Sequence, residues 1–350
     1  MTGAPIRKAD MFRSEHDLEQ ALTTPRPELV ADLAEGSGDL VILGAGGKMG
    51  PTLSVLARRA LDEAGRGGDT VYAVSRFGDA AMRERLAAER VVAVPFDLLS
   101  DADFAELPDA PSVIFMVGAK FGAATNSSWA WEVNAALPDR VARRYRDSAI
   151  AALSTGNVYP FVPAASGGSV ESDAPAPVGE YAMSCLGRER VFEFGAVTRG
   201  TRVALVRLNY AIDLRYGVLA DIGSTVLAGA PVDLTTGTVN VVWQGYANEV
   251  VLRSLGHASD AVFTLNLTGP EQLGVRRVAE RFGELLDTEV AFAGEPAPTA
   301  LLNDAGRCFE LFGYPDVPAG TLIEWQADWL RQGLPTSGKP TKWAVRDGRF

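Results

Sequence analysis

A glycine-rich segment near the start of the chain, GAGGKMG at residues 44–50, constrains the fold more than any other stretch of the sequence. Four apolar residues, 40–43, lead into it, and a segment with helical character, residues 51–60, follows it. A buried strand, a glycine turn and a helix N-terminus form an anion site, because glycines let the backbone approach a pyrophosphate while free N–H groups face its charge. Spaced glycines can also mark a purely structural turn, but the flanking strand and helix favour nucleotide binding.

The composition of the 350-residue chain excludes several classes of function. The net charge of −11, from 33 basic and 44 acidic residues, argues against nucleic acid or an anionic membrane as a partner. Two cysteines and two histidines argue against a disulfide framework and against a metal site built on these residue types. The first residues contain no apolar run typical of a secretory signal, and no apolar stretch has the length of a membrane span. We therefore expect a cytoplasmic protein.

Short apolar strands alternate with helices from about residue 39 to residue 208. Strands are expected at 40–43, 70–75, 91–94, 112–117, 150–154 and 202–207, and helices at 51–64, 79–89, 129–147 and 180–194. This alternation predicts an α/β fold with a Rossmann-type, doubly wound parallel sheet and helices on both of its faces.

The end of the second expected strand bears on the choice of dinucleotide. The strand TVYAVS ends at Ser75 and Arg76 follows, with no acid at either position. An acid there bonds the ribose 2′-hydroxyl, whereas a cation accepts a 2′-phosphate, so the sequence favours NADP over NAD. An arginine after a strand is also a common surface residue, which keeps NAD as the alternative. Asp97, after the third strand, either bonds the adenine amino group or is a turn or cap residue.

A series of motifs resembles the extended short-chain dehydrogenase/reductases, the family of NAD(P)-dependent sugar epimerases and dehydratases, over roughly residues 39–333. The resemblance implies that Thr155, in STGNVY, holds a substrate hydroxyl or carbonyl and that Tyr181, in GEYAMSCLGRER, exchanges its proton while hydride moves to or from the nicotinamide. The resemblance also implies that Tyr181 contacts the NAD(P) cofactor. The other residues expected to bind it are Gly44, Gly47, Lys48, Met49, Gly50, Ser75, Arg76, Asp97, Leu98, Val117, Gly118, Ala119, Lys120 and Asn134.

The sequence departs from the family pattern four residues after Tyr181. The family has a lysine there that is taken to bind the nicotinamide ribose and to favour the tyrosinate, whereas this chain has Cys185. Positions i and i+4 share one helical face, so Cys185 should lie beside Tyr181, as a candidate catalytic residue or as a small buried apolar one. An unperturbed tyrosine has a pKa of about 10 and is almost entirely protonated at neutral pH. Another cation is therefore needed to favour the tyrosinate. Lys120 or Arg188 would supply it, unless both lie on the solvated surface.

Residues beyond 208 should form most of a smaller, interleaved C-terminal α/β substrate lobe. Expected domains are a helical extension at 1–38, with Ser14 as a cap, an NAD(P)-binding domain at 39–208, and a lobe with a C-terminal tail at 209–350. Later segments near 239–267 should complete the sheet of the NAD(P)-binding domain. Expected lobe strands are 239–242 and 262–267, and expected helices are 272–286, 299–312 and 322–332.

Substrate contacts are expected on both sides of the cleft. The loop 160–179 is long enough to be a lid or a mobile surface loop. Trp243 and Gln244 would stack on and bond a sugar ring, or pack against the sheet instead. The tail, residues 336–350, carries no readable chemistry. The candidate substrate-binding residues are Lys120, Thr155, Asn157, Asn209, Arg215, Tyr216, Trp243 and Gln244.

Two functions follow as hypotheses. The first is an NAD(P)-dependent oxidoreductase or epimerase acting on a sugar, sugar acid or sugar nucleotide, with Gly156 and Asn157 arguing against a dehydratase, which has an acidic pair there. The second, motivated by Cys185, is a nucleotide-binding protein that has lost catalysis and acts as a cofactor sensor or scaffold. The presence of both Thr155 and Tyr181 favours the enzyme. The family resemblance also implies a homodimer packed through the helices at 129–147 and 180–194, with Val141, Leu186, Val191 and Phe194 as apolar contacts.

Overall fold

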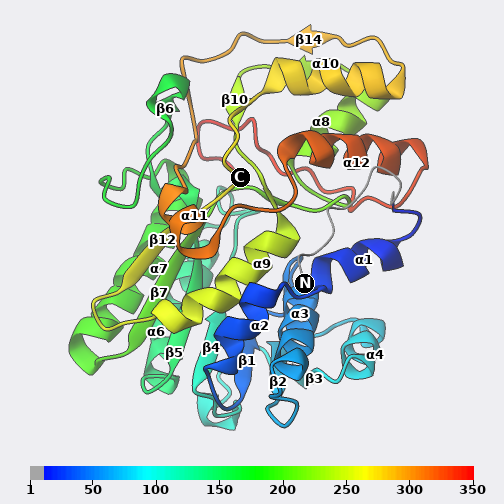
Figure 1. Ribbon diagram of the computed structural model, residues 1–350. Helices are drawn as coiled ribbons and strands as arrows, with labels where there is room; N and C mark the ends of the chain where they lie inside the picture. The colour runs from blue at the N-terminus through cyan, green and yellow to red at the C-terminus, as the bar shows by residue number, and fades with distance from the viewer. Residues whose placement is uncertain (1–11) are drawn as a thin grey trace.

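A seven-stranded parallel sheet forms the centre of the computed structural model, which describes residues 12–350 (Figure 1). The strand order is β12-β7-β5-β4-β1-β2-β3. The order reverses between β1 and β4, which both pair with parallel neighbours, and in such sheets a ligand crevice lies at the carboxyl ends of the strands at this reversal. The expected doubly wound fold is confirmed. The strands are β1 Leu40–Leu43, β2 Val71–Ser75, β3 Val92–Pro95, β4 Ser112–Phe115, β5 Ala149–Thr155, β7 Arg202–Leu208 and β12 Phe263–Leu267.

Helices cover both faces of the sheet because every second side chain of a strand points to the same face. Leu40 and Ile42 of β1 pack into one apolar core with α3 and α9, and Val41 and Leu43 pack into a second core with α6 and α7. The helices of these two layers are α3 Gly50–Glu63, α4 Ala80–Ala88, α9 Gln244–Arg253 and α11 Gly306–Phe312 on the first face, and α6 Leu137–Arg144 and α7 Gly179–Arg199 on the second.

The smaller lobe has an apolar core of its own beyond the carboxyl ends of the strands (Figure 1). Its main helices are α8 Val218–Leu227, α10 Val275–Leu286 and α12 Ala319–Arg331. Two helices of the N-terminal extension, α1 Glu15–Thr23 and α2 Pro27–Ala34, contact both units: Leu18 and Leu22 belong to the lobe core, while Leu29 belongs to the core beside α3. The cap by Ser14 is present, and residues 1–11 of the expected extension lie outside the described residues.

The predicted helix at 299–312 is wrong in its first half. Thr299–Ala300 forms strand β15, antiparallel to β6 Val162–Pro163, and the helix begins only at Gly306. The carboxylate of Asp304 accepts a hydrogen bond from the Gly306 N–H at 2.7 Å, which stabilises a helix start at that point.

The expected strand 239–242 does not complete the main sheet. It is divided between β10 Thr238–Val239, which pairs with β13 Leu273–Gly274, and β11 Val242–Trp243, which pairs with β8 Ala211–Ile212. Only β12 of the later strands joins the central sheet. The remaining short elements of the described chain are α5 Ser127–Trp131, a π-helical turn at Glu132–Ala136, β9 Val232–Asp233 paired with β14 Phe292–Ala293, and 3₁₀ turns at Phe104–Glu106, Gly156–Val158, Ala164–Ser166 and Ser254–His257.

The long loop 160–179 is held in place by backbone hydrogen bonds. Ser169 donates to the carbonyl of Leu302, and Asp304 donates to the carbonyl of Ser169, each at 2.9 Å. The loop therefore packs against residues 299–304 rather than hanging free. Across residues 12–350, every helix is too short or too polar to cross a lipid bilayer.

Candidate active site

The glycine loop forms a backbone surface that no side chain could share. Gly44 has φ +90°, and a Cβ there would lie 2.9 Å from the backbone nitrogen of Val117. A Cβ at Gly46 would lie 2.5 Å from Ser75 Oγ, and one at Gly50 would collide with the carbonyl oxygen of Ala45. The loop therefore brings β1, β2 and the segment after β4 together with bare backbone facing outward.

This loop fits a pyrophosphate. Within residues 12–350, the backbone N–H groups of Gly46, Lys48 and Met49 donate to no protein acceptor. They precede α3, whose 14 residues direct the positive end of the helix dipole at the same place. Lys48 and Met49 also line a cavity of about 260 Å³ at the carboxyl ends of the strands. The chain can thus hold the anionic centre of a dinucleotide there.

The structure supports a cofactor contact less clearly for the residues expected at the adenosine end of the dinucleotide. Arg76 is exposed directly after Ser75 at the end of β2, where it is free to meet a ribose substituent. Asp97 is exposed, and its carboxylate accepts a hydrogen bond from Leu99 N at 3.1 Å, the geometry of the turn residue that the sequence left as an alternative. Leu98 is buried in the core beneath it.

Asn134 fixes the loop after β4. Its Oδ1 accepts hydrogen bonds from Ala119 N at 2.9 Å and from Arg188 at 2.8 Å. Its Nδ2 donates to the Ala119 carbonyl at 3.0 Å and to Ser184 Oγ at 2.9 Å. Because the amide is fully buried and every bond is made, the loop is held with Val117 and Gly118 at the wall of the cavity.

Thr155, Asn157 and Tyr181 lie together on the cavity wall. Thr155 Oγ1 donates to Asn157 Oδ1 at 3.3 Å and accepts from Asn157 N at 3.2 Å, because a 3₁₀ turn follows directly after β5. Burial raises the pKa of Tyr181 above its usual value, while a hydrogen bond with Thr155 and the charge of Arg188 lower it. Tyr181 is therefore protonated at neutral pH in this state.

Cys185 lies beside Tyr181, as the i+4 spacing predicts. It is buried in a small cluster with Val158 and Tyr159, against which Tyr181 packs. Burial raises the pKa of the thiol, so Cys185 is neutral at pH 7 and contributes no charge to the site.

The expectation that Lys120 and Arg188 are solvated is wrong. Arg188 is buried and donates to the Leu153 carbonyl at 2.6 Å as well as to Asn134. Lys120 is half-buried, with Nζ 6.0 Å from the centre of the Tyr181 ring. Burial lowers the pKa of Lys120 to about 8, so it is charged at neutral pH. Two cations thus face Tyr181 although the family lysine is absent from its helix.

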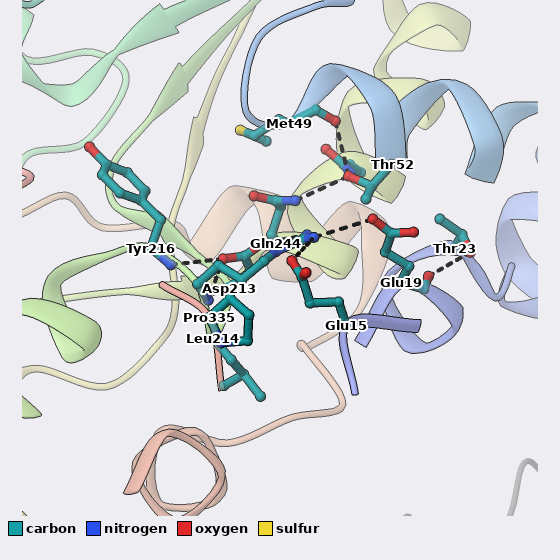
Figure 2. A network of polar contacts seen from close by, with 12 residues as sticks. Glu15, Glu19, Thr23, Met49, Thr52, Asp213, Leu214, Tyr216, Gln244 and Pro335 are labelled. Carbon is teal, nitrogen blue, oxygen red and sulfur yellow. Dashed lines mark hydrogen bonds and ion pairs between the residues drawn. The ribbon is translucent and has the colours of Figure 1, made fainter. Parts of the chain in front are cut away.

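The substrate candidates of the lobe separate into those at the cavity and those away from it. Asn209 and Gln244 line the cavity, with Gln244 Nε2 donating to Thr52 Oγ1 at 3.1 Å (Figure 2). Tyr216 lines it too, and the Lys48 ammonium lies over its ring. Asn209 also donates to Asn240 Oδ1 at 2.8 Å, which fixes its amide in the wall.

Trp243 and Arg215, two of the candidate substrate contacts, do not line this cavity, and for Trp243 the structure favours the packing alternative. Trp243 is buried edge-to-face against Trp325 at 5.7 Å, so packing in the lobe core is its role. Arg215 pairs with Asp213 at 2.9 Å and reaches Glu15 and Glu19 of α1. Figure 2 shows these three acidic residues. The guanidinium therefore ties the N-terminal extension to the lobe.

Residues near the end of the chain reach the site, which the sequence analysis missed. Thr341 lines the cavity, and the ring of Phe350 packs edge-to-face on Tyr181 with centres 5.5 Å apart. No motif or periodic pattern marks these positions, and more than 160 residues separate Tyr181 from Phe350. Nothing in the sequence alone could have signalled the contact.

A buried polar network supports the floor of the site. Glu189 of α7 is fully buried and accepts hydrogen bonds from Ser154 Oγ at 2.6 Å and from two nitrogens of Arg207 at 3.0 and 2.7 Å. Arg207 also donates to the hydroxyl of Tyr159 at 2.6 Å. The network joins β5, α7 and β7 directly below Thr155.

Comparison with known structures identifies the fold. Neither a protein-family model nor a curated protein matches the sequence. Among solved structures, a Bacillus cereus UDP-glucuronic acid 4-epimerase in complex with NAD matches with a TM-score of 0.70 and 16% identity, covering 84% of this chain and 99% of that one. The chain has the fold of the sugar-nucleotide epimerases. The expected resemblance to these enzymes is thereby confirmed at the level of the fold.

Two further epimerases give the same result. The Thermotoga maritima UDP-glucose 4-epimerase with UDP-glucose matches with a TM-score of 0.67 and 14% identity. The Thermus thermophilus UDP-glucose 4-epimerase in complex with NAD matches with a TM-score of 0.66 and 19% identity. Each match covers 84% of this chain and 99% of the other. The epimerase fold thus spans both the parallel sheet and the smaller lobe.

Proposed function

We propose that the protein is a nicotinamide-dinucleotide-dependent oxidoreductase or epimerase that acts on a sugar or sugar nucleotide. The observation that carries the proposal is that Thr155 and Tyr181 line the same cavity as Lys48 and Met49 of the glycine loop. The structurally similar epimerases, whose structures contain NAD or UDP-glucose, support this choice of cofactor and substrate class.

The side chains suit proton transfer coupled to hydride transfer. A bound nicotinamide would accept or return the hydride. Thr155 holds the reacting oxygen, and Tyr181, which lines the same cavity, removes or returns its proton. Lys120 and Arg188 stabilise negative charge on the phenol oxygen, which replaces part of what the absent lysine would provide. Asn134 and Asn157 keep the neighbouring loops in place through their hydrogen bonds.

Near-ultraviolet absorbance of reduced nicotinamide tests the proposal. Purified protein is mixed with NAD or NADP and with free sugars, sugar acids, UDP-glucose or UDP-glucuronic acid. A dehydrogenase accumulates reduced cofactor, whereas an epimerase shows it only transiently while converting one sugar isomer into another, which chromatography of the sugars detects. Cofactor binding without either change would contradict the proposal.

Arg76 makes the choice between NADP and NAD testable. We expect Arg76→Ala to weaken NADP binding about tenfold, since it removes a charge-assisted contact to the 2′-phosphate worth roughly 1.4 kcal/mol, and to leave NAD binding unchanged. Isothermal titration calorimetry measures both affinities. Arg83→Ala, at an exposed position of α4, is the matched control. An equal loss for both dinucleotides would show that Arg76 does not read the phosphate.

A second candidate function is cofactor binding without turnover, as a sensor or scaffold. The buried, neutral Cys185 in place of a cation favours it, as does the phenylalanine that covers Tyr181. This candidate predicts tight dinucleotide binding, no conversion of any sugar, and no effect of Tyr181→Phe on the protein's biological role.

We further propose a homodimer that packs through α5 and α7. Phe194 and Val197 on α7 are 57% and 82% exposed, and Met183 and the two tryptophans of α5 add to the same exposed apolar surface. Val141, in contrast, lies in the core of its own protomer and cannot contribute. Light scattering at micromolar concentration should give twice the chain mass, and Val197→Glu should reduce it to that of one chain. A monomeric mass for the unaltered protein would contradict the dimer.

A further inference from the structure

We propose that residues 336–350, which we call the strap, control access to one face of Tyr181, so that a substrate has to displace Phe350 before it can occupy that face. The inference rests on the proposed function, because it takes Thr155 and Tyr181 as the residues that meet the substrate. In Figure 1 the chain end labelled C lies between the lobe helices and the sheet.

Phe350 covers the phenol directly. Its side chain is only 6% exposed, and its ring meets that of Tyr181 edge-to-face at an angle of 78°. Its carbonyl oxygen accepts a hydrogen bond from Gly122 N at 3.2 Å, and Lys120 Nζ lies 4.5 Å from the centre of its ring. An apolar side chain thus occupies a face of Tyr181 that a substrate would need.

Specific contacts along its length hold the strap in this position. Thr341 donates from its backbone N and its hydroxyl to Asp221 Oδ2, at 2.8 and 2.6 Å, and its carbonyl accepts from Lys120 Nζ at 3.1 Å. Arg346 donates to the carbonyl of Thr299 at 2.7 Å. Toward its end the strap passes so close to α7 that a Cβ at Gly348 would lie 2.7 Å from the Cα of Gly179. The strap is therefore docked at its middle and at its end.

The docked strap leaves only a very small pocket on one side and a larger cavity on the other. Between Asn157, Tyr210 and the strap residues Trp343 and Phe350, the remaining pocket measures about 20 Å³, room for a single water molecule. The cavity of about 260 Å³ toward the glycine loop stays open. A dinucleotide can therefore approach from the loop side while a sugar ring cannot reach the covered face of Tyr181.

The strap can also be displaced from this position. It has no helix or strand of its own, and residues 336–340, Lys342, Asp347 and Arg349 are exposed, while Trp343 is buried in the lobe core. Segments with few buried contacts and exposed backbone open at low free energy compared with the whole fold. The binding energy of a substrate can therefore displace Phe350 and its exposed neighbours while Trp343 stays in the lobe core.

The test compares Phe350→Ala with Arg349→Ala, an exposed neighbour that serves as the matched control, and with Arg346→Ala, which removes an anchor remote from Tyr181. Nitration by tetranitromethane, mapped by mass spectrometry, reports access to Tyr181, with the exposed Tyr314 as internal reference. We expect nitration of Tyr181 at least fivefold faster in Phe350→Ala and faster in Arg346→Ala, with no change in Arg349→Ala. Circular dichroism verifies that each variant is folded.

Ligand binding provides the second readout. We expect Phe350→Ala to bind UDP-glucose, in the presence of saturating NAD, about tenfold more tightly, because the ligand no longer has to displace a buried phenylalanine. NAD affinity should stay within twofold of the unaltered protein. Equal nitration of Tyr181 in the unaltered protein and Phe350→Ala, or weaker UDP-glucose binding by the variant, would overturn the strap. Faster nitration without UDP-glucose binding in any variant would support the strap and count against the proposed substrate.

Discussion

Replacement of Tyr181 by phenylalanine should reduce turnover at least ~10²-fold while leaving the fold and dinucleotide binding unchanged. The hydroxyl is the group that exchanges a proton with the substrate, and positioned acid–base groups typically contribute 10²–10⁴-fold. The ring itself would remain, and with it the packing against Phe350 and Cys185. The absorbance assay and sugar chromatography described above measure the effect. Turnover within threefold of the unaltered protein would exclude Tyr181 as the proton-transfer group.

The pH dependence of carbonyl reduction and of hydroxyl oxidation provides a further check on the role of Tyr181 in proton transfer. Because burial raises its pKa, the phenol is protonated across the neutral range and is ready to donate a proton during reduction of a carbonyl. Oxidation of a hydroxyl needs the ionised form, whose fraction grows about tenfold for each pH unit below the pKa. Oxidation should therefore accelerate from pH 7 toward pH 9, less steeply above pH 8, where Lys120 with its pKa of about 8 loses its charge. Tyr181→Phe should abolish this rise.

Removal of the Glu189 carboxylate should destabilise the protein by about 3–5 kcal/mol. Glu189→Ala would leave the Arg207 guanidinium buried and without its paired charge, and an uncompensated buried charge costs free energy of this size. It would also remove the acceptor of Ser154, next to Thr155. Urea unfolding followed by circular dichroism measures the free energy of unfolding.

Glu193→Ala on the same helix is the matched control. Glu193 pairs with Arg190 at the surface, where such pairs contribute only about 0–1 kcal/mol. The double variant Glu189→Leu with Arg207→Met should recover part of the loss, since removal of both charges restores an apolar interior. A loss below about 1 kcal/mol for Glu189→Ala would mean that the network contributes little to stability.

Local sequence patterns were enough to predict the half of the fold that is built on the parallel sheet. The glycine loop and the alternating strands depend on local chemistry: strand periodicity and the backbone freedom of glycine. The i to i+4 spacing placed Cys185 beside Tyr181, whereas Thr155, Tyr181 and Asn134 themselves were identified through the family resemblance. These signals operate within a few residues along the chain, so they can be read without knowing what the segments later contact. The parallel sheet and the confirmed fold follow from them.

Packing between segments far apart in the sequence determines which side chains complete the site. In the sequence, Arg188 looks like a surface residue and Trp243 looks like a substrate contact. In the structure, Arg188 donates to buried acceptors of Asn134 and Leu153, and Trp325 packs against Trp243. Phe350 carries no signal at all, because its meeting with Tyr181 depends on how the lobe closes over the sheet. Burial and pairing between distant segments are properties of the packed chain, and they set charge and access at the site.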